Sequence, residues 1–218
     1  MIVKQVPNLI TLARLVLAVM AFYYMSAVIE LGESGAEQLL VKAAAFSAFW
    51  YFFIAAVTDW LDGFLARRNG WVTAIGRVAD PVVDKVLILG VMAYLSASNI
   101  YYARAGDWHV VMPVWAVVLS LGREFLVTAL RGMVEAAGKR FPADVFGKVK
   151  MLTQALYVGT ALGAYADVPS FVNFPQLVFL REPWFFFSMF WLMITLTVFS
   201  GINYCITGAR LLSGSLND

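Results

Sequence analysis

Long apolar runs alternate with short polar connections along this 218-residue chain. A helix needs roughly 20 predominantly apolar residues to cross the hydrocarbon core of a bilayer. Six stretches meet or approach that length: residues 9–29, 39–65, 81–97, 110–133, 151–165 and 183–209. The fifth is short, and we expect its helix to begin within the preceding sequence GKVK. The pattern predicts an all-α integral membrane protein, a bundle of six transmembrane helices.

The composition agrees with this pattern. Hydrophobic residues make up 61% of the chain and charged residues only 14%, with a mean hydropathy of +0.77. We find no composition shift, repeat or linker, so residues 1–218 are predicted to form a single membrane domain. The net charge of +2 is too small to suggest nucleic acid as a partner.

Lysine and arginine residues predict the orientation of the chain in the membrane. Most of them fall at or toward one side of the predicted spans, leaving Lys42, Arg104 and Arg181 for the other side. Because cationic loops are retained on the cytoplasmic side, we expect both termini to face the cytoplasm.

Four aspartates lie where the second and third apolar stretches meet. Asp59 and Asp62 are three residues apart, whereas Asp80 and Asp84 are four apart. Each pair shares one face of a helix, and Asp80-Pro81 resembles a helix start or a bend. If the two helices pack side by side, the four carboxylates converge, and positive charge must lie among them.

Two arrangements supply that charge. In the first, nearby cations form a structural ion-pair network with the aspartates; the candidates are Arg67, Arg68, Arg77 and Lys85. In the second, the carboxylates hold hard divalent cations, Mg²⁺, Mn²⁺ or Ca²⁺, which prefer all-oxygen sites. The small residues Gly63, Ala66 and Gly76 would let a diphosphate approach the backbone, and Arg67 could bind phosphate oxygens. The second arrangement therefore suggests phosphoryl transfer.

The segments DWLDGFLAR at residues 59–67 and GRVADPVVD at 76–84 together resemble the signature of the CDP-alcohol phosphotransferase family. All eight defining positions are present at the expected spacing. The resemblance implies a six-helix membrane enzyme, usually a homodimer, that joins an alcohol to the phosphatidyl part of a CDP-linked lipid and releases CMP.

The resemblance also implies roles for individual residues. Asp59, Asp62 and Asp80 would bind two divalent ions, and Asp84 would lie near the ions and act as the catalytic base. The predicted CDP-binding residues are Gly63, Ala66, Arg67 and Gly76.

Cationic residues further along the chain bear on the acceptor alcohol. Arg123 lies within the apolar run PVWAVVLSLGREFLVTAL, where a charge either pairs with an acid such as Glu124 or serves a substrate. Further cationic residues follow Arg123 toward the same membrane side, and a group of cations suits an anionic acceptor. The candidates for binding an acceptor phosphate are Arg123, Lys139, Lys148, Lys150 and Arg131. Retention of positive charge on the cytoplasmic side explains the lysines equally well.

Four other segments resemble a subfamily, the bacterial phosphatidylglycerophosphate synthases: PNLITLARL at 7–15, GREFLVTALR at 122–131, GKR at 138–140 and GKVK at 147–150. This resemblance implies that CDP-diacylglycerol and sn-glycerol 3-phosphate give phosphatidylglycerol phosphate and CMP at the cytoplasmic face of the bacterial inner membrane. Asn8, Thr11 and Arg14 share one helical sector, which either reaches the nucleotide or forms a polar helix start. His109 is assigned an interfacial role.

Alternative functions remain open from the sequence. Within the family, these are a cardiolipin synthase using phosphatidylglycerol and a phosphatidylinositol-phosphate synthase. From another class, a divalent-cation or proton transporter would also use intramembrane carboxylates. A transporter predicts charged groups at midplane in several helices and access from both sides, whereas these aspartates cluster toward one side.

Overall fold

A computed structural model describes residues 6–69, 74–98, 101–104, 107–110, 112–139, 141, 145–168 and 182–213. Within them lie six long helices: α1 (Val6–Glu33), α2 (Gln38–Asn69), α3 (Ala74–Ala97), α4 (Val114–Ala136), α5 (Val145–Tyr165) and α7 (Pro183–Ser213). The strands β1 (Tyr101–Arg104) and β2 (Asp107–Val110) form an antiparallel hairpin between α3 and α4. The all-α prediction missed this hairpin.

The predicted helices agree with the observed ones in order and number within the described residues. α5 begins at Val145, two residues before the sequence GKVK, so this helix is longer at its start than we expected. α3 begins at Ala74, so Asp80 and Pro81 lie inside this helix and do not start it. Gly138, in the left-handed conformation with φ 72°, follows the end of α4, a common way for a helix to stop.

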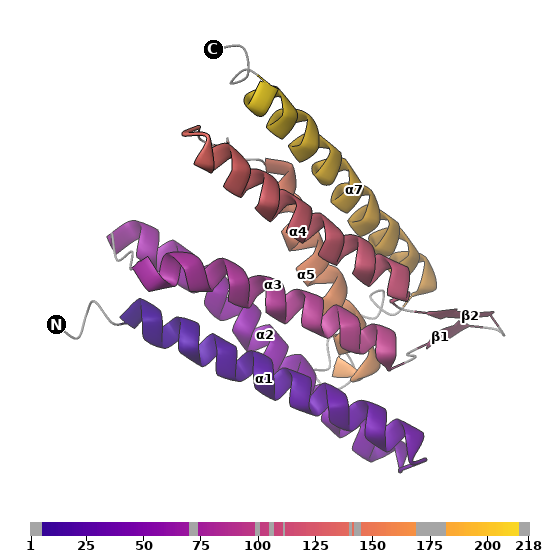
Figure 1. Ribbon diagram of the computed structural model, residues 1–218. Coiled ribbons are helices and arrows are strands. Elements are labelled where there is room, and N and C mark those ends of the chain that lie inside the picture. Colours follow the sequence, from indigo (N-terminus) through magenta and orange to yellow (C-terminus); the bar gives the residue numbers. More distant parts are fainter. Residues whose placement is uncertain are drawn as a thin grey trace.

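The helices pack as a bundle whose long axes run in broadly the same direction (Figure 1). α1 packs against α2 and α3, α5 bridges α2 and α7, and α4 contacts α7 and α3. The first turn of α1 and the last turn of α7 lie at one end, whereas the hairpin lies at the opposite end (Figure 1). The beginning of α1 and the end of α7 therefore lie on the same side of the bundle.

Apolar side chains occupy both the core and the outer surface. The core includes small residues of α1 and α2, such as Ala18, Ala21 and Ala48, packed with Met92 and Leu95 of α3. Large apolar side chains such as Leu12, Val118 and Phe187 are exposed. In the part of the chain that the structure describes, three helical segments are long and apolar enough to span a membrane: Ile10–Glu33, Gln38–Thr58 and Trp184–Ser213. These features make the chain a membrane protein.

Several polar side chains are buried. They are Thr11, Arg14, Ser120, Glu124, Lys150, Thr153, Gln154, Thr197 and Ser200. In a bilayer such groups face the interior of the bundle, because hydrocarbon offers them no hydrogen bonds. Their positions therefore locate the polar interior in which a site can form.

Packing between α1 and α3 predicts the effect of a small substitution at Gly90. A Cβ atom at this position would lie 2.3 Å from Cζ of Phe22, whose ring stacks on Tyr94. We expect Gly90→Ala to destabilise the protein by about 1–3 kcal/mol through overpacking. Thermal unfolding in detergent would measure this as a lower Tm.

The matched control is Gly132→Ala on α4, where a Cβ would meet no atom within 4 Å. This change should be neutral or should stabilise the helix by up to about 1 kcal/mol. Equal Tm shifts for the two variants would show that the α1–α3 contact at Phe22 is not tight.

Candidate active site

An ion pair inside the bundle joins α1 to α3. Nη1 of Arg14 donates a hydrogen bond to Oδ1 of Asp84 at 2.7 Å, and the two side chains are 2% and 15% exposed. Removing one partner of a buried pair typically costs about 3–5 kcal/mol, since the other charge loses its counter-ion. Arg14 is therefore not part of a solvated helix start, and it fixes the position of Asp84.

The next residue of α3, Lys85, contacts a different neighbour. Its Nζ donates to Oγ1 of Thr128 at 2.9 Å and lies 3.4 Å from Oε2 of Glu124, both on α4. One arrangement considered from the sequence paired Lys85 with the four aspartates. The structure pairs Lys85 with Thr128 and Glu124, so that assignment was wrong for Lys85.

Glu124 is the centre of a buried charged cluster. Its Oε1 accepts hydrogen bonds from Nζ of Lys150 at 2.6 Å and from Nη1 of Arg123 at 2.8 Å. Lys150 is 3% exposed and Glu124 is 9% exposed. The sequence alternative in which Arg123 pairs with Glu124 is confirmed as a contact. We call Lys85, Arg123, Lys150 and Glu124 the Glu124 cluster.

Arg123 is also held from the last helix. Its Nε and Nη2 both donate to Oγ of Ser200, at 3.2 and 3.0 Å, and its guanidinium carbon lies 5.2 Å from the centre of the Tyr204 ring. A cation over an aromatic face is attracted to the ring. These contacts fix Arg123 independently of Glu124.

A cavity of about 240 Å³ adjoins the cluster. Its polar lining consists of Asp84, Lys85, Arg123, Glu124, Lys150 and Gln154. Arg14 offsets the charge of Asp84, so among the described side chains the three cations set against Glu124 leave an excess of two positive charges beside the cavity. A site with this charge suits a small anion.

The structure brings only part of the predicted acceptor set to this cavity. Arg123 and Lys150 line it, whereas Lys148 is exposed. Lys139 donates to the carbonyl of Leu211 at 2.6 Å, near the end of α7, and Nη2 of Arg131 lies 3.4 Å from the hydroxyl of Tyr204. The predicted set thus includes three cations that do not line the cavity.

Lys85, Glu124 and Gln154 were missed as members of this site. Sequence signals could have found two of them. Glu124 follows Arg123 directly, and Gln154 lies four residues after Lys150 on the same helical face. The position of Lys85 depends on how α3 packs against α4, which spacing alone does not give.

Most of the predicted metal and CDP residues have side chains outside what the structure describes. Their backbone is helical, with Asp59, Asp62, Gly63, Ala66 and Arg67 in α2 and Gly76 and Asp80 in α3. Asp84 is the predicted metal ligand whose side chain is described. Among the described side chains, no three potential metal-binding groups of the histidine, cysteine or carboxylate type gather.

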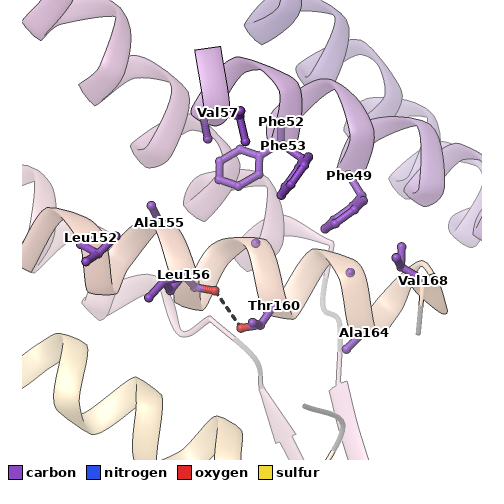
Figure 2. Close-up of a pocket in the computed structure, with 13 residues that line it drawn as sticks. Phe49, Phe52, Phe53, Val57, Leu152, Ala155, Leu156, Thr160, Ala164 and Val168 are labelled. Carbon is purple, nitrogen blue, oxygen red and sulfur yellow. Dashed lines mark hydrogen bonds between the residues drawn. The ribbon is translucent and has the colours of Figure 1, made fainter. Parts of the chain in front are cut away.

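A second cavity, of about 430 Å³, lies between α2 and α5. Phe49, Phe52, Phe53 and Val57 approach it from α2, opposite Leu152 and Leu156 of α5 (Figure 2). Gly159 and Gly163 let the rings of Phe52 and Phe49 pack close to α5, where added Cβ atoms would lie 3.3 and 3.0 Å from them. We call this cavity the α2–α5 groove.

The lining of the α2–α5 groove is almost wholly apolar. The hydroxyl of Thr160 donates to the carbonyl of Leu156 at 2.9 Å, so this polar group is satisfied within its own helix (Figure 2). Val57 lies two residues before Asp59 on α2, so one end of the groove reaches the same depth along this helix as the predicted metal ligands. The groove thus suits an apolar chain that ends near these aspartates.

Comparisons with known proteins agree with the sequence signature. The family model described as CDP-alcohol phosphatidyltransferase matches residues 4–202. A Bacillus subtilis (strain 168) protein is 30% identical over 201 residues, covering 92% of this chain and 93% of its own length. A Sodalis glossinidius protein is 33% identical over 191 residues, covering 85% and 91%. One from Escherichia coli (strain K12) is 36% identical over 155 residues, covering 69% and 72%. All three are named CDP-diacylglycerol–glycerol-3-phosphate 3-phosphatidyltransferase.

Proposed function

Since this chain belongs to the CDP-alcohol phosphatidyltransferase family, we propose that it transfers the phosphatidyl group of CDP-diacylglycerol to sn-glycerol 3-phosphate. The products would be phosphatidylglycerol phosphate and CMP. The single observation that carries the choice of acceptor is the Glu124 cluster beside Asp84, with its two excess positive charges. A phosphomonoester carries about −1.5 to −2 charges at pH 7, which matches that excess.

The same observation separates the acceptors considered from the sequence. Phosphatidylglycerol, the acceptor of a cardiolipin synthase, brings a phosphodiester with one negative charge and a bulky lipid to a cavity of about 240 Å³. Inositol phosphate is a phosphomonoester, so charge alone does not exclude it. The names of the three relatives favour glycerol 3-phosphate over it.

The predicted metal site fits two divalent ions, Mg²⁺ or Mn²⁺. Its donors are four carboxylates, Asp59, Asp62, Asp80 and Asp84, and hard cations prefer oxygen ligands. Asp84, the member with a described side chain, is held in place by Arg14 at the edge of the polar cavity. When bound, the ions would neutralise the diphosphate and stabilise charge on the departing CMP.

The protein's own residues would then position the acceptor and move its proton. Lys150 and Arg123 bind the acceptor phosphate, which holds a glycerol hydroxyl near Asp84. As the hydroxyl oxygen bonds to phosphorus, Asp84 accepts its proton, and the bond from phosphorus to the CMP oxygen breaks. Gly63, Ala66, Arg67 and Gly76 contact the CDP group.

We also propose how the enzyme lies in the membrane. Six helices span the inner membrane of a bacterium, with both termini and the active site facing the cytoplasm. The common location of the start of α1 and the end of α7 supports this topology (Figure 1). The active enzyme is a homodimer in this proposal.

The α2–α5 groove is proposed to hold an acyl chain of CDP-diacylglycerol. A lipid substrate gains stability by keeping its tails in apolar surroundings while its headgroup reaches polar residues. The groove meets this need, because its α2 wall ends at Val57, next to Asp59 and Asp62. The lipid would thus keep its tail between helices while its diphosphate reaches the carboxylates.

The central experiment measures CMP release by purified protein with CDP-diacylglycerol, Mg²⁺ and one acceptor at a time. We expect release with glycerol 3-phosphate, and none with phosphatidylglycerol or inositol phosphate. Asp84→Asn is the control and should bind the CDP-lipid but release no CMP. Release with either of the other acceptors but not with glycerol 3-phosphate would overturn the proposed acceptor.

Lys150 and Lys148 provide a matched test of the acceptor site. Both lie on α5 and both were candidates from the sequence, but only Lys150 lines the polar cavity. A lost charged hydrogen bond costs about 1.5–3 kcal/mol. We therefore expect Lys150→Met to raise the KM for glycerol 3-phosphate by about 10- to 100-fold.

Lys148→Met should leave this KM within about twofold of the wild-type value, because an exposed charge contributes little. Steady-state kinetics at saturating CDP-diacylglycerol would measure both variants. Equal effects of the two substitutions would show that Lys150 does not bind the acceptor phosphate and contributes only to membrane topology.

A substitution in the α2–α5 groove tests the proposed acyl-chain site. Ala155→Phe would fill part of the groove. We expect the KM for a long-chain CDP-diacylglycerol to rise by about tenfold, while a short-chain analogue keeps its KM. Val118→Phe, at an exposed position of α4, is the control. Equal donor kinetics for all three proteins would exclude the groove as the acyl site.

A further inference from the structure

Glu124 has no assigned role in the proposed reaction, although within the described part of the chain it forms more ion pairs than any other side chain. It contacts cations from three helices: Lys85 of α3, Arg123 of its own helix α4 and Lys150 of α5. Two of them share Oε1, at 2.6 and 2.8 Å, and the third lies 3.4 Å from Oε2. One carboxylate thus contacts each of the three cations that line the polar cavity among the described side chains.

Without this carboxylate the cluster would be unstable as it stands. The three cations repel one another, and Lys150 is only 3% exposed, so water cannot screen its charge well. The three contacts lie close to a single carboxylate, which constrains where each cation can sit. Glu124 therefore determines how far apart the positive groups lie beside the cavity.

The cations depend on Glu124 to different degrees. Arg123 is also held by Ser200 and by the Tyr204 ring, and Lys85 also donates to Thr128. For Lys150, Glu124 is the acceptor of its hydrogen bond within the described part of the chain. Loss of Glu124 would therefore displace Lys150 first and leave Arg123 closest to its original position.

The charge of the cluster indicates what it recognises. One carboxylate set against three cations leaves two positive charges, the number that a phosphomonoester dianion neutralises. A phosphodiester, with one negative charge, would leave one positive charge beside the cavity without a partner. A dianion should therefore bind this arrangement better than a monoanion does.

We infer that Glu124 is the positioning residue that makes the acceptor site specific for a phosphomonoester. It does so by holding Lys85, Arg123 and Lys150 in fixed positions beside the polar cavity. This inference rests on the proposed function, because it concerns the acceptor of that reaction. Glu124 does not touch the reacting atoms; it acts through the three cations.

The test compares glycerol 3-phosphate with its methyl phosphodiester in wild type and in Glu124→Gln, which keeps the side-chain shape but removes its charge. In wild type we expect kcat/KM to favour the phosphomonoester by at least about tenfold. In Glu124→Gln the KM for glycerol 3-phosphate should rise by about tenfold or more and most of the preference should disappear. The KM for CDP-diacylglycerol should stay within about twofold, which a general loss of structure would not allow.

Three further variants sharpen the result. Glu135→Gln, an exposed position on the same helix, should behave as wild type. Glu124→Asp keeps the charge on a shorter side chain and should restore part of the preference, which also covers the case in which Glu124→Gln does not fold. If Glu124 acts through Lys150, the double variant with Lys150→Met should have little more effect on the acceptor KM than Lys150→Met alone.

The outcomes separate the inference from the proposed function. If wild type releases no CMP with glycerol 3-phosphate but does so with inositol phosphate, the proposed acceptor is wrong, and the comparison is repeated with inositol phosphate and its methyl diester. An unchanged phosphomonoester preference in Glu124→Gln, or equal increases in donor and acceptor KM, overturns the inference. Activity with phosphatidylglycerol alone overturns both.

Discussion

The ion pair between Arg14 and Asp84 is the interaction on which the arrangement of the site depends. It places a nearly inaccessible guanidinium from α1 against a carboxylate of α3, 2.7 Å apart. Because an unpaired charge inside the bundle is costly, α1 and α3 are held in the one register that allows this contact. Asp84 thereby has a fixed position at the wall of the polar cavity, next to the cations that would receive the acceptor.

The distribution of polar groups explains how such a site survives in a membrane. Large apolar side chains lie on the outside, whereas the buried charged groups Arg14, Glu124 and Lys150 each have a partner from a neighbouring helix. The two cavities reflect the same division, one lined by charged groups and the other almost wholly apolar. A substrate with a charged head and hydrocarbon tails would need both environments close together, and α5 lines both cavities.

Much of the fold could be predicted from the sequence, because apolar stretches of suitable length correspond to helices. The short hairpin after α3 could not, since its residues lie between apolar stretches without a strand pattern of any length. In the site, Lys148 and Lys150 look equivalent in sequence, yet one is exposed and the other is buried against Glu124. Their difference arises from which face of α5 packs inward, a property of the whole bundle. Arg14 was placed in a polar sector, but its partner Asp84 is 70 residues away and depends on how α1 crosses α3.

Successive residues of α3 bond to different helices, Asp84 to α1 and Lys85 to α4. Side chains of neighbouring residues point about 100° apart around a helix, so turning α3 about its axis would break both bonds together. The rotation of α3 about its axis is therefore fixed from two sides. Motions that admit or release substrates must then leave its rotation unchanged, and insertion of one residue just before Asp84 would misalign both bonds in a single step.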